Sequence, residues 1–165
     1  MTKGDILFKE NDFIFSYRVG GILINNNKIL LQKQVGDEGY AIPGGHVVYK
    51  ETTEETLIRE FKEELNADIK IRNLTAIGEI FFPWDNKPCQ QICLYYNIEF
   101  NESNQIQLED GFRGFDEAGD ERFDLEYFWI PLEKLSEIEI YPKELVPHIL
   151  SGSNNIFHFV SRQFL

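Results

Sequence analysis

GHVVYKETTEETLIREFKEELNA, residues 45–67, is the stretch that decides the fold of this chain. Within it, Thr52 is followed three residues later by Glu55, which is the signature of a capping box at the start of a helix. Apolar side chains then recur at helical spacing, at Leu57, Ile58, Phe61 and Leu65. We therefore predict a helix from about Thr53 to Leu65 whose apolar stripe packs against a sheet.

A second face of the same helix is acidic. Glu60, Glu63 and Glu64 are spaced i, i+3 and i+4, so their carboxylates project together and repel by about 0.2–0.5 kcal/mol per i,i+4 pair. Arg59 and Lys62 offset part of this charge. A Mg²⁺ ion offsets it better, because Mg²⁺ prefers oxygen ligands and keeps waters and substrate phosphates in its shell. On the charge run alone, a solvated helix face is the simpler interpretation.

The segments on both sides of this helix have the alternation and the residue types of strands. The predicted elements are a hairpin of residues 13–24 and 28–32, a loop at 36–39, a short strand at 40–42, a break at 43–45, strands at 69–82, 91–100 and 125–130, a turn at 132–135, a helix at 142–150 and a final apolar stretch at 156–160. The two prolines of residues 83–88 are expected to interrupt regular strand pairing there. No repeat or linker divides the chain, so we expect one domain over residues 1–165.

The composition is that of a folded domain with localised acidity. The chain has 165 residues, 42% of them apolar and 14% aromatic, and a formal net charge of −12. A domain near this size removes roughly 70% of its unfolded surface from water, which is enough for a stable core without disulfides or a structural metal. The acidity argues against nucleic acid and anionic membranes as partners, since both are bound by clustered Lys and Arg. Residues 51–64 carry −4 of the charge and residues 101–126 carry −7.

The only cysteines, Cys89 and Cys93, are expected to be buried free thiols. One pair without a second Cys/His cluster is poor evidence for zinc, and the chain has no Asp-rich loop of the calcium-binding type. The amino end lacks the apolar core of a secretory signal, and no apolar run approaches the roughly 20 residues that span a bilayer. Cytoplasmic localisation is therefore the expectation.

Seven residues of the opening stretch match a known signature at its required spacing: Gly45, Glu51, Arg59, Glu60, Phe61, Glu63 and Glu64. Together they resemble the Nudix box of the Nudix hydrolases, which is Gly, five residues of any kind, Glu, seven of any kind, Arg-Glu, an apolar residue, any residue, Glu-Glu, any residue, Gly and an apolar residue. AIPGGHV at 41–47 and FWIPL at 128–132 also resemble family segments in their usual order. The resemblance thus extends over most of the chain.

The chain departs from the signature at a few positions, none of which carries the chemistry. Asn66 stands where the family has Gly at the end of the helix, and Asn readily adopts the left-handed cap conformation. Lys50 replaces a frequent Gly just before Glu51, Val48 replaces a frequent acid, and Ala67 is a small version of an apolar position. No metal-binding carboxylate is missing, so none of these changes indicates an inactive protein.

The resemblance implies an α/β fold, namely an α/β/α sandwich with a mixed β-sheet. It also implies hydrolysis of a diphosphate linkage by attack of water on phosphorus, with Mg²⁺ or Mn²⁺ as cofactor. The metal ligands it implies are Glu60, Glu64, Glu63 and the backbone carbonyl of Gly45. Glu63 would share a second ion or polarise the attacking water, Arg59 would orient the carboxylates, and Glu51 would fix Arg59.

The second acidic segment is expected to form a loop at residues 109–121, and its glycines predict mobility. Many Nudix enzymes draw a further metal ligand or general base from a loop outside the box. We assign this catalytic role to Glu121, with Asp120 as the next choice. A solvated loop that keeps the protein soluble is an equally good interpretation of any one of these acids.

Residues of the substrate pocket are harder to predict. The candidates for stacking on a base are Tyr40, Phe82, Trp84 and Phe112, and the candidates for meeting phosphate are Arg18 and Lys33. Core packing and surface charge are the ordinary interpretations of these residue types.

We expect a small-molecule nucleotide as the partner, either ADP-ribose or a nucleotide sugar, or a nucleoside triphosphate. No nucleic acid or membrane is expected to bind, and the protein should be a monomer or a homodimer. The alternative is a catalytically silent Nudix-fold module that binds or senses a nucleotide. The complete set of acids in the box speaks against this alternative.

Overall fold

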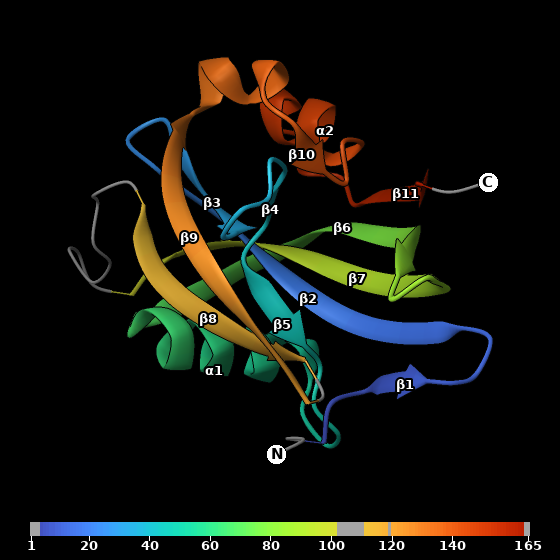
Figure 1. Ribbon diagram of the computed structural model, residues 1–165. Helices are drawn as coiled ribbons and strands as arrows, with labels where there is room; N and C mark the ends of the chain where they lie inside the picture. The colour runs from blue at the N-terminus through green and yellow to red at the C-terminus, as the bar shows by residue number, and fades with distance from the viewer. Residues whose placement is uncertain (1–3, 102–110, 119, 164–165) are drawn as a thin grey trace.

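The computed structural model describes residues 4–101, 111–118 and 120–163 (Figure 1). These residues form strands, two α-helices and one 3-10 helix. In chain order the elements are β1 (Leu7–Lys9), β2 (Ile14–Asn25), β3 (Lys28–Gln34), β4 (Tyr40–Ala41), β5 (Gly44–His46), α1 (Thr53–Leu65), β6 (Ile69–Trp84), β7 (Lys87–Phe100), β8 (Phe112–Ala118), β9 (Glu121–Pro131), the 3-10 helix η1 (Leu132–Glu137), β10 (Ile140–Tyr141), α2 (Leu145–Ser151) and β11 (Phe157–Arg162).

The strands form a mixed sheet with two wings that meet at β2. The main path runs in the order β10-β4-β3-β2-β7-β6-β11, with β1 and β5 paired to β2, and β9 pairing with both β3 and β8. β2 is parallel to β7, β4 to β10 and β6 to β11, and the other pairs are antiparallel. β2 pairs with β3 only at its last residues, Ile24 with Ile29 and Asn25 with Lys28. Beyond this short hairpin contact, the β3-β9-β8 wing is free to diverge from the β2-β7-β6 wing (Figure 1).

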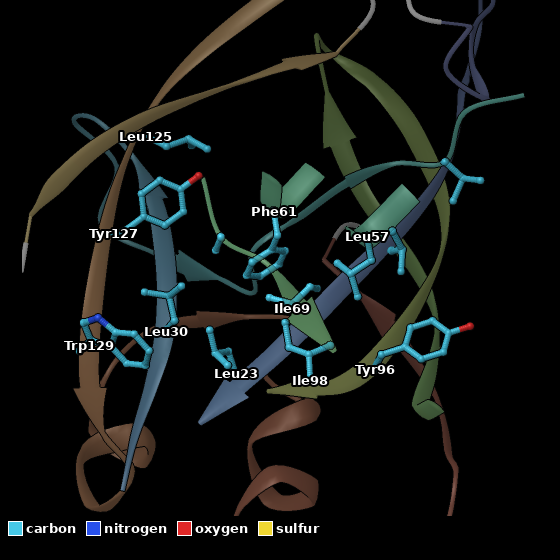
Figure 2. Close-up of a cluster of buried hydrophobic side chains, with 13 residues drawn as sticks. Leu23, Leu30, Leu57, Phe61, Ile69, Tyr96, Ile98, Leu125, Tyr127 and Trp129 are labelled. Atoms are coloured by element: carbon cyan, nitrogen blue, oxygen red, sulfur yellow. The ribbon is translucent and has the colours of Figure 1, made fainter. Parts of the chain in front are cut away.

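Helices cover the sheet on two sides, with α1 on one side and α2 with η1 on the other (Figure 1). Figure 2 shows Leu57 and Phe61 of α1 packed with side chains of the sheet, among them Leu23, Leu30 and Ile98. A second cluster joins the sheet to Leu135 of η1 and Leu145 of α2. Each such side chain stabilises the fold by about 1.5–3 kcal/mol when fully buried. The predicted α/β fold with a mixed sheet is confirmed.

Helix α1 has the bounds and the caps that the sequence predicts. The Thr52 hydroxyl accepts a hydrogen bond from the Glu55 amide at 3.1 Å, and the Glu55 carboxylate accepts one from the Thr52 amide at 2.8 Å. Asn66 ends the helix with φ of 50°, in the left-handed region. One detail of the predicted stripe is wrong. Ile58 is 44% exposed, because the buried face is narrow and centred on Leu57 and Phe61.

The loop predicted at residues 109–121 is the main error of the sequence analysis. Residues 112–118 are strand β8 and Glu121 begins β9, with Phe112 paired to Tyr127 and Ala118 paired to Glu121. The pairing partner of β8 follows it in the chain, so the two acids and one glycine of β8 do not prevent a strand. Glu109 and Asp110 lie outside the described residues.

The prolines at 83 and 88 also do not interrupt pairing, contrary to prediction, because Pro83 lies opposite Pro88 in the antiparallel ladder of β6 and β7. β7 pairs with β2 only from Cys89 onward, and β11 pairs with β6 only as far as Phe81. Neither proline therefore lies where its backbone nitrogen would have to donate a hydrogen bond to a third strand. Proline has no amide hydrogen and is unable to make such a bond.

The carboxyl-terminal elements follow the prediction with shifted bounds. Helix α2 begins at Leu145 rather than at residue 142, and the last apolar stretch is strand β11. Cys89 and Cys93 are buried and free, as expected. In the described part of the chain, neither helix has the length and apolar character needed to cross a membrane.

Candidate active site

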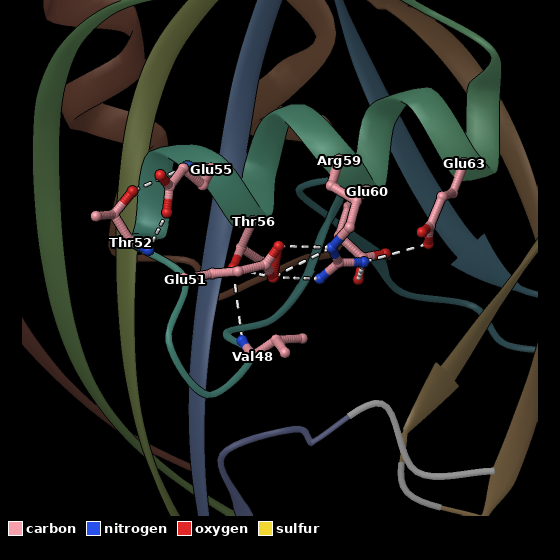
Figure 3. Close-up of polar contacts among 8 residues, drawn as sticks. All are labelled: Val48, Glu51, Thr52, Glu55, Thr56, Arg59, Glu60 and Glu63. Atoms are coloured by element: carbon pink, nitrogen blue, oxygen red, sulfur yellow. Dashed lines mark hydrogen bonds and ion pairs between the residues drawn. The ribbon is translucent and has the colours of Figure 1, made fainter.

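The loop before α1 and the helix itself hold Arg59 in a network of carboxylates (Figure 3). Arg59 donates from Nε and Nη2 to Glu51, with 2.8 Å contacts to Oε2 and Oε1 respectively. Its Nη1 donates to Glu60 Oε1 at 3.1 Å and to Glu63 Oε2 at 3.2 Å. The hydrogen bonds to Glu51 raise the pKa of Arg59 above its ordinary value. The expected pairing of Glu51 with Arg59 is present, and it fixes the guanidinium that orients Glu60.

Three carboxylates converge next to this network. One oxygen each from Glu60, Glu64 and Asp116 lie within 4.8 Å of one another. Glu60 and Asp116 are each only 6% exposed. The helix spacing brings Glu60 and Glu64 together, and the pairing of β8 with β9 adds Asp116 from a distant part of the chain. The sequence analysis missed Asp116.

Glycine at position 45 makes room for one of these carboxylates. A Cβ atom on Gly45 would lie 2.6 Å from Glu60 Cδ, closer than real Cβ contacts allow. Strand β5 brings Gly45 against α1 because it pairs with β2, Gly45 opposite Val19. Just before the helix, Lys50 has φ of 74°, the left-handed conformation that the usual Gly of the family would adopt more easily. Lys50 therefore adopts the backbone conformation of the usual Gly, at a small cost in conformational free energy.

Burial and mutual repulsion make it unfavourable for all three carboxylates of the acid cluster to be charged at once. Burial raises the pKa of Glu64 well above its ordinary value, and the neighbouring Asp116 and Glu60 raise it further. Tyr127 donates its hydroxyl to Glu64 Oε2 at 3.3 Å. Burial is the largest influence on the pKa of Arg18 and lowers it, but Asp116, with 3.7 Å between the charged atoms, together with Glu64 and Glu60 and other neighbours outweighs burial, so the pKa of Arg18 is raised. Arg18 pairs with Asp116, and Arg59 is shared by Glu51, Glu60 and Glu63, so these two arginines leave the acids short of positive charge. A cation is the natural complement.

The donor set fits a hard divalent cation. Carboxylate oxygens are the ligands that Mg²⁺ and Mn²⁺ prefer, and the cluster offers three of them within 4.8 Å. Glu63, also predicted as a ligand, is outside this group in the structure, because its side chain is 43% exposed and turned to Arg59. The backbone carbonyl of Gly45 stays a predicted ligand.

A cavity of about 530 Å³ lies between the two wings of the sheet and reaches the acid cluster at Arg18 and Asp116. Pockets for small ligands commonly have this size. The structure brings the following predicted residues together in its lining: Arg18, Lys33, Tyr40, Phe82, Trp84 and Glu121. Phe112 is elsewhere, since it stacks on Tyr127 with 5.0 Å between ring centroids and packs on the core.

Glu121 lies in the cavity wall but not in the acid cluster. Its carboxylate accepts a hydrogen bond from Lys9 Nζ at 2.7 Å, and Asp120 is exposed. Among the described acids of the second acidic segment, the one that joins Glu60 and Glu64 is thus Asp116. Both sequence choices, Glu121 and Asp120, therefore miss the cluster, because strand alternation along β8 and β9, rather than nearness in the chain, decides which acid faces α1.

Fold and site together define the class of this protein: a mixed sheet between helices, with paired acids on α1 facing a third acid beside an open cavity. Residues 15–149 match the family described as the NUDIX domain. The chain belongs to this family, and the resemblance stated from its sequence is confirmed.

Individual relatives are similar over different extents. A segment of 62 residues is 42% identical to the ADP-ribose pyrophosphatase of Methanocaldococcus jannaschii, and it covers 36% of this chain and 37% of that protein. The mutator MutT protein of Bacillus halodurans has a similar fold, with a TM-score of 0.60 at 17% identity over 90% of this chain and 91% of that one. The Ap4A hydrolase of C. elegans has a TM-score of 0.55 at 20% identity, over 82% and 94%.

Proposed function

We propose that this protein is a pyrophosphohydrolase that cleaves the diphosphate linkage of a nucleoside diphosphate joined to another group, with Mg²⁺ or Mn²⁺ as cofactor. The observation that carries the proposal is the convergence of Glu60, Glu64 and Asp116 within 4.8 Å at the edge of a nucleotide-sized cavity. These three side chains would hold the cation. When bound, it neutralises charge on the diphosphate and activates water for attack on phosphorus.

The chain's own residues orient the reactants. Arg59 holds one oxygen of Glu60 at 3.1 Å, so the carboxylate is fixed before substrate enters. Arg18, mostly buried at the junction of cluster and cavity, is the cation that meets the phosphates. Glu63 is proposed to accept the proton of the attacking water, because its carboxylate is 43% exposed and lies beside the acid cluster, 3.2 Å from Arg59 Nη1. Glu121, in the cavity wall, is a second candidate for that role.

The substrate classes favoured are ADP-ribose or a nucleotide sugar, and a nucleoside triphosphate. The aromatic side chains of the cavity wall support a nucleotide, since every base offers a flat face for stacking. The name of the relative in Methanocaldococcus jannaschii, ADP-ribose pyrophosphatase, supports the first of these classes. We propose a protein without affinity for nucleic acid or membranes, located in the cytoplasm, and acting as a single domain.

A panel of nucleoside diphosphate compounds tests the proposal. Phosphate release after coupling to a phosphatase is measured with Mg²⁺ for ADP-ribose, UDP-glucose, Ap4A and the nucleoside triphosphates. Glu64→Gln should lower kcat/KM by more than about 100-fold, since loss of a mere outer-shell partner of a metal already costs 10–100-fold. Glu54→Gln, on the exposed side of the same helix, is the matched control. Binding without turnover of any compound would instead favour the silent nucleotide-binding module.

A further inference from the structure

A buried chain of hydrogen bonds reaches the wall of the cavity at Gln91 and includes no residue of the acid cluster. The Ser16 hydroxyl is 2.9 Å from Nε2 of His46 and 3.0 Å from Oε1 of Gln91. Ser16 is 0% exposed, His46 2% and Gln91 9%. The three side chains come from β2, β5 and β7, and the sheet brings them together because Ser16 pairs with Gln91 and Arg18 pairs with His46.

The direction of this chain follows from the other nitrogen of His46. Nδ1 is buried and has no hydrogen-bond partner among the described residues. A buried N–H without an acceptor is rarer and more costly than a lone pair without a donor. The ring proton therefore belongs on Nε2, where Ser16 accepts it. The single hydroxyl proton of Ser16 is then free to go to the carbonyl oxygen of Gln91.

This direction fixes which end of the Gln91 amide is available to a ligand. With its oxygen held by Ser16, the NH₂ group is what remains, and Gln91 is part of the cavity wall. An amide that no neighbour oriented would rotate to present either a donor or an acceptor. Here the bond from Ser16 holds the amide in one orientation, and its NH₂ group is the end left to donate to a ligand.

The surroundings of that donor suit a base. Ile80 lies opposite Gln91 on β6, and Phe82 follows on the same face of the strand. Phe82 and Trp84 are stacked, with 6.3 Å between ring centroids and 18° between planes. A single amide donor beside apolar and aromatic side chains is the arrangement that fixes the orientation of a mostly apolar ligand.

We propose that Gln91 is a specificity-determining residue that donates a hydrogen bond to an acceptor atom of the substrate's base, and that Ser16 and His46 are positioning residues that hold its amide in this orientation. The inference rests on the proposed function for the class of substrate. It goes beyond that function in naming the residue that selects among bases.

Binding of nucleoside monophosphates separates this inference from the hydrolysis itself, because these compounds have no diphosphate linkage to cleave. Affinities for AMP, IMP, CMP and UMP are measured by calorimetry relative to ribose 5-phosphate, which has the same sugar and phosphate but no base. Gln91→Glu replaces the donor with an acceptor. For the tightest-binding nucleotide, the affinity relative to ribose 5-phosphate should fall by about 10- to 100-fold.

Gln90→Glu is the matched control, since it makes the same change on the next residue of β7, which is exposed. It should leave the affinities relative to ribose 5-phosphate within twofold of the wild type. An unchanged ratio in Gln91→Glu, an equal change in Gln90→Glu, or no binding of any nucleotide would each overturn the inference. Failure of the hydrolysis assay would leave these binding ratios unaffected, so the two claims fail separately.

The positioning role has its own readout. The two ring ¹⁵N shifts of His46 report which nitrogen carries the proton, and the inference requires Nε2–H in the folded protein. Ser16→Ala should release the Gln91 amide, so that preference among the four nucleotides narrows while the affinity for ribose 5-phosphate stays the same. A proton on Nδ1, or unchanged preference in Ser16→Ala, contradicts the role.

Discussion

The carboxylates of the candidate metal site come from two regions that are held in different ways. Glu60 and Glu64 stand one turn apart on α1, so their relative geometry is a property of the helix. Asp116 lies on β8, which among the described strands pairs only with β9. The helix presents its two acids whatever the hairpin does, whereas the third acid depends on the packing of β8 and β9 against α1.

One side chain joins the two regions. Tyr127 of β9 is 0% exposed, stacks on Phe112 of β8, and donates its hydroxyl to Glu64 of α1. Phe61 lies in the same cluster (Figure 2). The comparison shows that two of the three acids are positioned by a single helix, whereas the third acid is positioned by the packing of the core.

Among changes to the hairpin, the largest effect on activity is expected from removing its acid, Asp116. Asp116→Asn keeps the shape of the side chain but takes one charge from the cluster, so kcat/KM at fixed Mg²⁺ should fall by about 10- to 100-fold. Part of the loss should be recovered at higher Mg²⁺ if affinity for the cation is what changed. Steady-state hydrolysis over a Mg²⁺ titration measures both.

Asp124→Asn is the matched control for this variant, because Asp124 belongs to the same hairpin and its side chain is 67% exposed. It should retain the wild-type kcat/KM. Equal activities of Asp116→Asn and the wild type would mean that the helix acids suffice without the hairpin.

The second effect is on stability without metal. The folded state raises the pKa of Glu64 above its ordinary value of 4.5, so it holds a proton that the unfolded chain releases. The contribution of Glu64 to the stability of the metal-free protein should therefore fall as pH rises above 4.5. Thermal denaturation in chelator over a pH series should show a shallower decline for Glu64→Gln than for the wild type, while Glu54→Gln keeps the wild-type slope. Equal slopes for all three would contradict the account.

The smallest effect is expected from a change at the amino-terminal end of α1, where the capping interactions are local. Thr52→Ala removes the hydroxyl that accepts from the Glu55 amide, and loss of such a cap costs about 1 kcal/mol. Because Leu57 and Phe61 still anchor α1, kcat should not change. Urea denaturation and turnover are measured on one preparation, to distinguish a loss of stability alone from an effect on the site. A fall in kcat together with the loss of stability would show that the cap positions the acids.

The same division decides what could be predicted from the sequence. The bounds of α1, its capping box and the left-handed Asn66 depend on neighbours within a few residues, and all are present in the structure. The spacing of Gly45, Glu51 and Arg59 likewise specifies contacts within one loop and one helix. These parts of the fold and site were predictable because the interactions that fix them are local.

The hairpin was not predictable in the same way, although one signal was available. Gly119-Asp120 separates residues 112–118 from 121–131, and a two-residue connection of this composition is typical of a hairpin. Even with the hairpin recognised, the choice of Asp116 over Glu121 depends on which face of β8 meets α1. That face is set by the register of β9 on β3, Leu125 opposite Gln34, which no short pattern states.

Binding of Mn²⁺ to the wild type, Glu64→Gln, Asp116→Asn and the double variant, followed by electron paramagnetic resonance, tests the central claim most directly. If acids of α1 and β8 hold one ion, each single variant should lose about 10- to 100-fold in affinity, and the double variant should lose less than the product of the two. Wild-type Mn²⁺ affinity in Asp116→Asn, with loss only in Glu64→Gln, would contradict a site shared between helix and hairpin.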